Sequence, residues 1–203
     1  MIIKNEEHFK EFLLEYSQEE SQVKRREIEQ EIWSLYGEKK AVLIIDMTGF
    51  TVLTERWGSV HYLSMITRMQ RVTKPIIEQY NGEVVKFEAD NCFAIFDNVE
   101  ESINASIELN KALEIENQKT PDKFDIKIGC GIAYGNILLL ENEDIYGNAV
   151  NIASKLGEDI AAIGEILVTY KAMKNITINE TFKYTPIKHT ISKVDILGFS
   201  ITY

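Results

Sequence analysis

An uninterrupted run of apolar residues, Ala41–Ile45, ends at Asp46 and is followed by Thr48 and Gly49. A run of this length, rich in β-branched side chains and leucine, predicts a strand that is buried on both faces. The aspartate then stands where the strand stops and a helix begins. This strand is the reference against which the other elements can be placed.

Helical periodicity flanks the strand on both sides. Upstream, residues 5–36 carry two apolar stripes separated by a charged stretch, 19–26, which fits either two short helices or one long helix. Downstream, apolar residues recur every three or four positions over 59–80 and, more loosely, over 98–117. Both segments are predicted to be amphipathic helices, and Pro75 is expected to kink the first.

The remaining apolar runs alternate or are short, as is typical of strands. They fall at 83–87, 92–96, 124–133, 137–140, 164–168, 182–188 and 191–203, and a helix begins near Asn148. The order β-α-β-β-α-β with an α-β tail predicts an α+β, ferredoxin-like sandwich: a mostly antiparallel sheet with helices on one face. We expect a helical N-terminal extension over 1–40 and one domain over 41–203.

Composition and charge limit the kinds of molecule that this protein is expected to bind. The 203 residues are 45% hydrophobic and carry a formal net charge of -10, which argues against general binding to nucleic acid or to anionic membranes. Cys92 and Cys130 lie in apolar runs, as buried reduced thiols do. Without a signal peptide or an apolar run approaching about 18 residues, the chain is expected to be soluble and cytoplasmic, with no membrane insertion.

Two aspartates stand at predicted strand ends, Asp46 and, in a hairpin turn, Asp90. Taken alone, such an aspartate more often caps the next helix. The N–H groups at a helix entrance can also bind anionic oxygens, and Mg²⁺ prefers one or two carboxylates together with phosphate oxygens. Further along, Asn151 and Lys155 are four residues apart and share one face of a predicted helix.

Two common nucleotide-binding motifs are excluded. Residues 129–135 superficially match a dinucleotide-binding loop, but Tyr134 stands where the third glycine belongs and the segment lies within a strand. No GxxxxGK[ST] sequence occurs, so the chain is not a P-loop NTPase.

Four sequence blocks together resemble the catalytic domain of class III nucleotidyl cyclases, the adenylate and guanylate cyclase domain. The resemblance spans about 41–203, and its blocks, in order, are 46–51 (DMTGFT), 86–90 (KFEAD), 128–135 (IGCGIAYG) and 144–156 (DIYGNAVNIASKL). Each block is weak alone, but four in the right order and spacing make a strong signal. The resemblance implies the nucleotidyl cyclase fold.

The resemblance also implies a metal and phosphate site. Asp46 and Asp90 match the metal-binding aspartates, with the carbonyl of Met47 as a further ligand, and together they would hold two Mg²⁺ or Mn²⁺ ions per site. The turn formed by Thr48, Gly49, Phe50 and Thr51 matches the segment whose backbone binds phosphate.

The matched residues downstream would bind the rest of the nucleotide. Lys86 and Asp144 match the pair that recognises adenine, where guanine-selective relatives typically carry Glu and Cys. Asn151 matches the asparagine that orients the ribose. Lys155 stands where the family usually has a transition-state arginine, and Lys193 aligns loosely with a phosphate-binding lysine.

The implied reaction converts ATP to 3′,5′-cyclic AMP and pyrophosphate, by attack of the ribose 3′-OH on the α-phosphate with two metal ions at the site. In the family the metal aspartates come from one domain and the base-reading residues from another. This chain carries both sets, so a head-to-tail homodimer would form two composite active sites. The segment 1–40 would support the dimer or regulate it.

Two positions depart from the family pattern. Lysine at 155 keeps the charge but loses the planar fork of arginine. Glu88-Ala89 precedes Asp90, where a glycine is usual; alanine is unfavourable there if φ is positive, and Glu88 is expected to point away. These departures leave open a degenerate domain that binds nucleotide or dimerises without turnover. A diguanylate cyclase is disfavoured, because the hairpin lacks a Gly-Gly-Asp/Glu-Glu-Phe turn.

Overall fold

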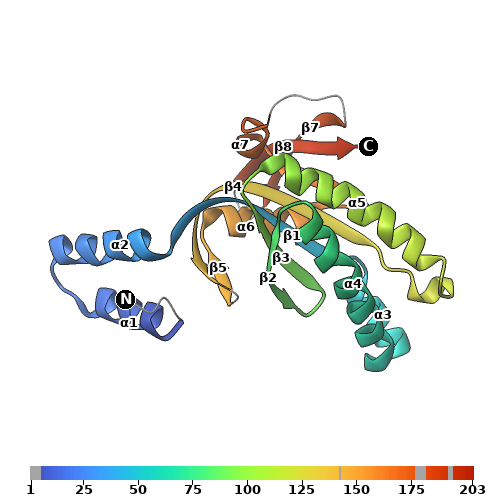
Figure 1. The fold of residues 1–203 in the computed structure, drawn as a ribbon, viewed down its shortest axis with the longest axis horizontal. Helices are drawn as coiled ribbons and strands as arrows, with labels where there is room; N and C mark the ends of the chain where they lie inside the picture. The colour runs from blue at the N-terminus through green and yellow to red at the C-terminus, as the bar shows by residue number, and fades with distance from the viewer. Residues whose placement is uncertain (1–5, 142, 177–181, 192–193) are drawn as a thin grey trace.

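The computed structural model describes residues 6–141, 143–176, 182–191 and 194–203 (Figure 1). The helices are α1 (Glu6–Gln18), α2 (Gln22–Tyr36), α3 (Phe50–Trp57), α4 (Ser59–Gln79), α5 (Val99–Asn117), the 3₁₀ turn η1 (Asp122–Phe124), α6 (Asn148–Ser154), the π-helix η2 (Lys155–Ile160) and α7 (Tyr170–Met173). The strands are β1 (Gly37–Met47), β2 (Glu83–Glu88), β3 (Asn91–Phe96), β4 (Ile128–Leu140), β5 (Asp144–Tyr146), β6 (Ile166–Thr169), β7 (Lys183–Ile191) and β8 (Val194–Thr202).

All eight strands belong to one sheet, in the order β2-β3-β1-β4-β6-β8-β7, with β5 added to the end of β4. The β4–β6 pair is parallel and the other pairs are antiparallel. The prediction of an α+β fold with a mostly antiparallel sheet and N-terminal helices is therefore confirmed.

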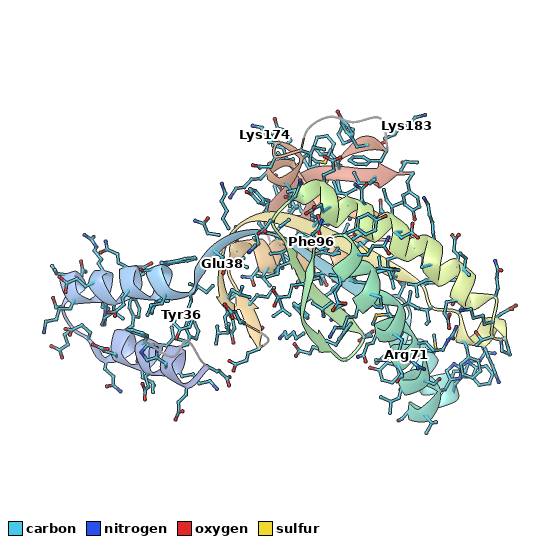
Figure 2. The ribbon with its side chains drawn as sticks, viewed as in Figure 1. Tyr36, Glu38, Arg71, Phe96, Lys174 and Lys183 are labelled. Carbon is cyan, nitrogen blue, oxygen red and sulfur yellow. The ribbon has the colours of Figure 1, made fainter. Side chains whose placement is uncertain are left out.

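Both faces of the sheet are covered, rather than the one face expected from the sequence. Alternate residues of β1 point to opposite sides. Leu43 and Ile45 pack with α4 and α5, whereas Val42 and Ile44 pack with α6. All four are completely buried, as the apolar run predicted. Phe96 lies at the centre of the molecule, in the core shared with α4 and α5 (Figure 2).

The N-terminal segment is a hairpin of two short helices, which settles the choice that the sequence left open. Its apolar stripes meet in a small core with Tyr36 and the end of β4 at Leu140. Figure 1 shows the hairpin at one end of the molecule, on the side where β5 lies. It therefore touches the rest of the chain near β4 and β5 and leaves α4 and α5 uncovered.

Several boundaries differ from the predictions. Residues 128–140 form one long strand rather than two, since pairing with β1 runs unbroken from Met47↔Ile128 to Gly37↔Leu138. The helix 59–79 continues through Pro75. The short elements β5 and α7 had no counterpart in the predicted pattern, whereas α3 begins at the helix entrance expected after Asp46 and η2 takes up the end of the helix expected from Asn148. Among the described residues, no helix combines the length and the apolar character needed to cross a membrane.

Candidate active site

The strand end at Asp46 and the hairpin turn at Asp90 lie beside each other. Asp46 is directly opposite Asn91 in the β1–β3 ladder, so the turn that carries Asp90 adjoins the end of β1. Because side chains alternate along a strand, Asp46 shares the face of Val42 and Ile44, which is the face covered by α6 and η2. The structure therefore brings the two predicted metal-binding carboxylates together.

Negative charge accumulates at this point. Burial, the largest cause, and the nearby carboxylates of Asp90, Glu158 and Asp159 together raise the pKa of Asp46 to about 7. Burial likewise raises the pKa of Asp90 and of Glu158. Among the described residues, no group of three or more acidic, histidine or cysteine side chains is placed to hold a metal ion, so the candidate ligands here are the two carboxylates of Asp46 and Asp90.

Two residues of this region were missed by the sequence analysis, Glu158 and Asp159 on η2. Their approach depends on glycines in the facing backbones. A Cβ on Gly157 would lie 2.9 Å from the carbonyl oxygen of Ile44, and a Cβ on Gly131 would lie 2.4 Å from the nitrogen of Gly157. The glycines at 129 and 131 thus let η2 pack directly on β4. Residues 129–135 lie within this strand, so the rejection of a dinucleotide-binding loop there was correct.

The predicted phosphate turn follows Met47. The N–H of Thr48 donates to the carbonyl of Lys127 at 2.8 Å, so this amide is already used within the protein. Gly49 has φ 86° and precedes the first residue of α3, Phe50. A left-handed conformation of this kind favours glycine, so the glycine at position 49 allows the chain to make this turn.

Lys86 and Asp144 form an ion pair, with 3.1 Å between the lysine Nζ and the Oδ1 of the aspartate. The pair depends on an irregularity in β2: the register with β3 shifts between Val84, opposite Ala94, and Lys86, opposite Phe93. Val85 is the extra residue of this bulge. It turns the side chain of Lys86 to the same face of the sheet as Phe93, which is the face covered by α6. The structure therefore brings the predicted base-reading residues together, across 58 positions of sequence.

The sequence analysis expected Glu88 to point away from Lys86 and Asp90, but in the structure it points toward Lys86. It accepts a hydrogen bond from Lys86 at 2.7 Å, because residues two apart in a strand share a face. Although burial lowers the pKa of Lys86, its hydrogen bonds to Glu88 and Asp144 raise it above the usual value. The ammonium group also lies 4.7 Å from the ring centroid of Phe93. Lys86 is consequently held charged between two carboxylates.

The predicted ribose and transition-state residues lie at the junction of α6 and η2. Asn151 is exposed on α6, and Lys155, the first residue of η2, is half-buried. Within the described ranges, no ion pair or side-chain hydrogen bond of Lys155 is found. Lys193 lies outside the described residues.

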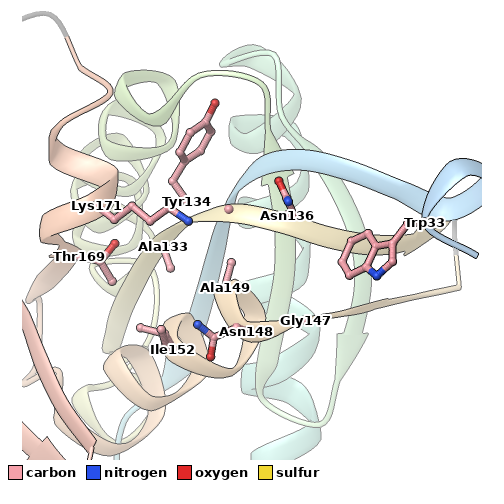
Figure 3. A pocket seen from close by; sticks show the side chains of 11 residues that line it. Trp33, Ala133, Tyr134, Asn136, Gly147, Asn148, Ala149, Ile152, Thr169 and Lys171 are labelled. Carbon is pink, nitrogen blue, oxygen red and sulfur yellow. The ribbon is translucent and has the colours of Figure 1, made fainter. Parts of the chain in front are cut away.

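A separate pocket of about 350 Å³ lies beside the start of α6, between β4 and Trp33 of the N-terminal hairpin (Figure 3). It is lined by Trp33, Ala133, Tyr134, Gly135, Asn136, Gly147, Asn148, Ala149, Ile152, Thr169 and Lys171. None of the predicted site residues is among them. The Asp46–Asp90 pair and the Lys86–Asp144 pair therefore both lie outside this pocket.

A family model for the adenylate and guanylate cyclase catalytic domain matches residues 36–198. The chain belongs to this cyclase family. A relative described as putative adenylate cyclase 3 from Rhizobium meliloti (strain 1021) is 25% identical over 129 residues, which are 64% of this chain and 22% of the relative. This chain therefore corresponds to less than a quarter of that relative's length.

Solved structures confirm the cyclase fold. The adenylyl cyclase CyaB from P. aeruginosa has a TM-score of 0.70 at 19% identity, covering 83% of this chain and 97% of that one. The guanylyl cyclase Cya2 has a TM-score of 0.71 at 15% identity, with coverage of 81% and 92%. At these identities the likeness concerns the fold, so the choice of nucleotide must be argued from this chain's own residues.

The turn before Asp90 gives a stability prediction. Ala89 has φ 51°, a left-handed conformation that disfavours residues with a Cβ. Ala89→Gly is therefore expected to raise the free energy of unfolding by about 1 kcal/mol in urea titrations. Ala112→Gly within α5 is the matched control and should lower it by about 1 kcal/mol. Equal losses in both variants would contradict this account of the turn.

The raised pKa of Asp46 predicts a pH-dependent metal affinity. Its carboxyl group holds a proton in the folded chain at pH values where the unfolded chain has lost it. The metal-free fold should therefore lose stability as pH rises from about 4 to about 7. A metal ion must displace the proton, so the Mn²⁺ affinity should rise about tenfold per pH unit up to about pH 7 and then level off.

Calorimetric titration of the nucleotide-free protein with Mn²⁺ at several pH values measures this dependence directly. The exposed Asp122 provides the control, since Asp122→Asn should leave the profile unchanged. An affinity that is flat between pH 5.5 and 7.5 would show that Asp46 is not the titrating ligand.

Proposed function

We propose that this protein is an adenylate cyclase that converts ATP to 3′,5′-cyclic AMP and pyrophosphate at sites shared by two copies of the chain, in cytoplasmic signalling. The observation that carries the choice of ATP is the ion pair between Lys86 and Asp144. Lysine can donate to a ring nitrogen of adenine, and aspartate can accept from its 6-amino group. Guanine presents a 6-oxo group and an N1–H, the reverse pattern, so this pair should disfavour GTP.

The residues at the end of β1 fit divalent cations. Asp46 and Asp90 supply two carboxylates with raised pKa values, and the carbonyl of Met47 is a third oxygen in the same segment. The neighbouring Asn91 has a buried side-chain oxygen with no hydrogen-bond partner among the described residues. When bound there, two Mg²⁺ or Mn²⁺ ions would supply activation of the ribose 3′-OH and neutralisation of the departing oxygens.

The other groups of this chain position the nucleotide. The turn from Thr48 to Thr51 would hold the phosphates at the entrance of α3, and Asn151 would orient the ribose from α6. Lys155 would place a positive charge beside the transferring phosphoryl group, with Lys193 as a further phosphate contact. Because phosphoryl transfer depends on positioning and charge stabilisation, no protein nucleophile is required.

The assay is product formation from ATP or GTP with Mg²⁺ or Mn²⁺, resolved by chromatography. We expect cyclic AMP from ATP and at least about tenfold less cyclic GMP from GTP, since a reversed hydrogen-bonding pattern costs more than 1.4 kcal/mol. Lys86→Ala should lower this preference. Lys40→Ala is the matched control, because Lys40 also bridges two carboxylates, Glu38 and Asp97, but on β1 away from the pair.

Cyclic GMP as the main product would overturn the choice of nucleotide. The replacement of arginine by Lys155 favours the second candidate, a domain that binds nucleotide without turnover. ATP binding by a dimer that forms no cyclic product would support that function instead.

A further inference from the structure

We propose that Tyr146 is a positioning residue that sets the base preference of the nucleotide site, and that the N-terminal hairpin holds it in place through Phe9. The inference rests on the proposed function, in which Asp144 reads the base. It gives a functional role to Tyr146 of β5 and Phe9 of α1, two aromatic residues that the sequence analysis did not connect with the site.

The hydroxyl of Tyr146 fixes one half of the Asp144 carboxylate. It donates to Oδ2 at 3.2 Å. The other oxygen, Oδ1, accepts from the N–H of Ile145 at 2.8 Å and pairs with Lys86 at 3.1 Å. With a donor on each oxygen, the carboxylate plane cannot rotate freely, which leaves its remaining lone pairs in a defined direction for a base.

Tyr146 can act as the donor at neutral pH. Burial raises the pKa of its hydroxyl, and the negative charge of Asp144 raises it further. The hydroxyl therefore keeps its proton at neutral pH and remains a donor to Asp144. Tyr146 and Asp144 are also two residues apart in one strand, so that their side chains share a face.

β5 is too short to fix these side chains by backbone pairing alone. It has three residues, which lie opposite the last residues of β4 in the register Leu138↔Tyr146, Leu139↔Ile145 and Leu140↔Asp144. Ile145 is buried in the core beneath α6, but Tyr146 is 42% exposed. Its orientation consequently depends on what packs against its ring.

That contact comes from the N-terminal hairpin. The ring of Phe9 stacks on Tyr146, with 5.8 Å between centroids and 12° between planes. Phe9 is 5% exposed and packs edge-on against Tyr36 at 5.0 Å. The same small core includes Leu140, the residue opposite Asp144. The hairpin thus holds both the strand that pairs with β5 and the ring that orients Asp144.

The arrangement gives a specific kinetic consequence. If Tyr146 loses its hydroxyl, Asp144 loses one donor, and if the ring loses its stacking partner, that donor is held less firmly. In both cases Asp46 and Asp90, at the opposite end of β1, keep their surroundings. Base preference and KM should then change more than kcat. A merely structural role for the ring would not move the ratio of ATP to GTP.

The first test replaces the hydroxyl and leaves the ring, by Tyr146→Phe. We expect the ratio of kcat/KM for ATP to that for GTP to fall about tenfold, mostly through KM for ATP, because a hydrogen bond to a charged group is lost. Tyr184→Phe on β7 is the matched control, since Tyr184 is equally 42% exposed and lies far along the sheet. It should leave the ratio within twofold of the unchanged protein.

The second test addresses the hairpin in the full chain, with Phe9→Leu. It should shift the ratio in the same direction, by about threefold, since the stack is weakened while the hydroxyl remains. Phe12→Leu is matched to it, because Phe12 is buried in the same core at 9% exposure but meets the ring of His8 rather than Tyr146. Phe12→Leu should change stability as much as Phe9→Leu and leave the ratio unaltered.

The same ratio can be measured without turnover, as dissociation constants for ATP and GTP in the Asp46→Asn background. If the protein forms cyclic AMP but Tyr146→Phe behaves as Tyr184→Phe does, this inference is wrong and the proposed function stands. If no cyclic product forms but the binding ratio falls with Tyr146→Phe, the inference holds for a nucleotide-binding domain. A protein that neither binds nor cyclises either nucleotide would overturn both.

Discussion

Asp46→Asn is expected to abolish cyclic nucleotide formation, by at least about 10³-fold in kcat with either Mg²⁺ or Mn²⁺. The substitution keeps the size of the side chain and removes the charge that would hold both cations. Asparagine would also remove the cost of burying this carboxylate and its repulsion with Asp90, Glu158 and Asp159, which together raise the pKa of Asp46. The inactive variant should therefore melt at the same temperature as the unchanged protein or higher, when both are free of metal.

A thermal melt together with the activity assay separates this loss from unfolding. Asp97→Asn is the control, because Asp97 also follows a strand, β3, but its side chain is 83% exposed and pairs with Lys40. That variant should keep its activity within twofold. Retained activity in Asp46→Asn would mean that Asp46 holds no catalytic metal.

Two inactive variants are expected to restore activity when mixed. If each site takes Asp46 from one copy and Asn151 from the other, a dimer of Asp46→Asn with Asn151→Ala has one intact site and one doubly altered site. With random exchange of subunits in an equal mixture, half of the dimers are mixed, and activity per protein should reach about one quarter of the unchanged level.

The measurement is cyclic product formed by the mixture after refolding or prolonged exchange, against each variant alone. A site built within a single copy predicts no recovery at any ratio. The exposed position of Asn151 on α6, and the absence of the predicted site residues from the pocket beside Trp33, favour recovery.

The strong elements of the fold could be predicted because their patterns are long. The apolar run before Asp46, the amphipathic repeat over 59–79 and the alternation in β4 each extend over several residues, so local periodicity indicates them reliably. Periodicity placed Asp46 and Asp90 at strand ends, but their pairing at one site came from the resemblance to the cyclase family, and the β1–β3 register is what brings them side by side.

The features that the sequence did not reveal depend on contacts between distant segments. Three residues of β5 are too few to show a period, and the π-helix after Ser154 follows from glycine contacts with β4 rather than from its own composition. The stack of Phe9 on Tyr146 joins positions 137 residues apart, and no local pattern encodes it. The approach of Glu158 to Asp46 was missed for the same reason.

The bulge in β2 also bears on how copies of this chain can associate. β2 is the outermost strand on its side of the sheet, and such a strand offers free N–H and C=O groups to any other chain. The extra residue at Val85 and the charged Lys86 and Glu88 interrupt this regular row. Edge-to-edge growth of the sheet, a first step toward fibrous aggregates, is thereby discouraged at the strand that carries Lys86, the residue proposed to read the base.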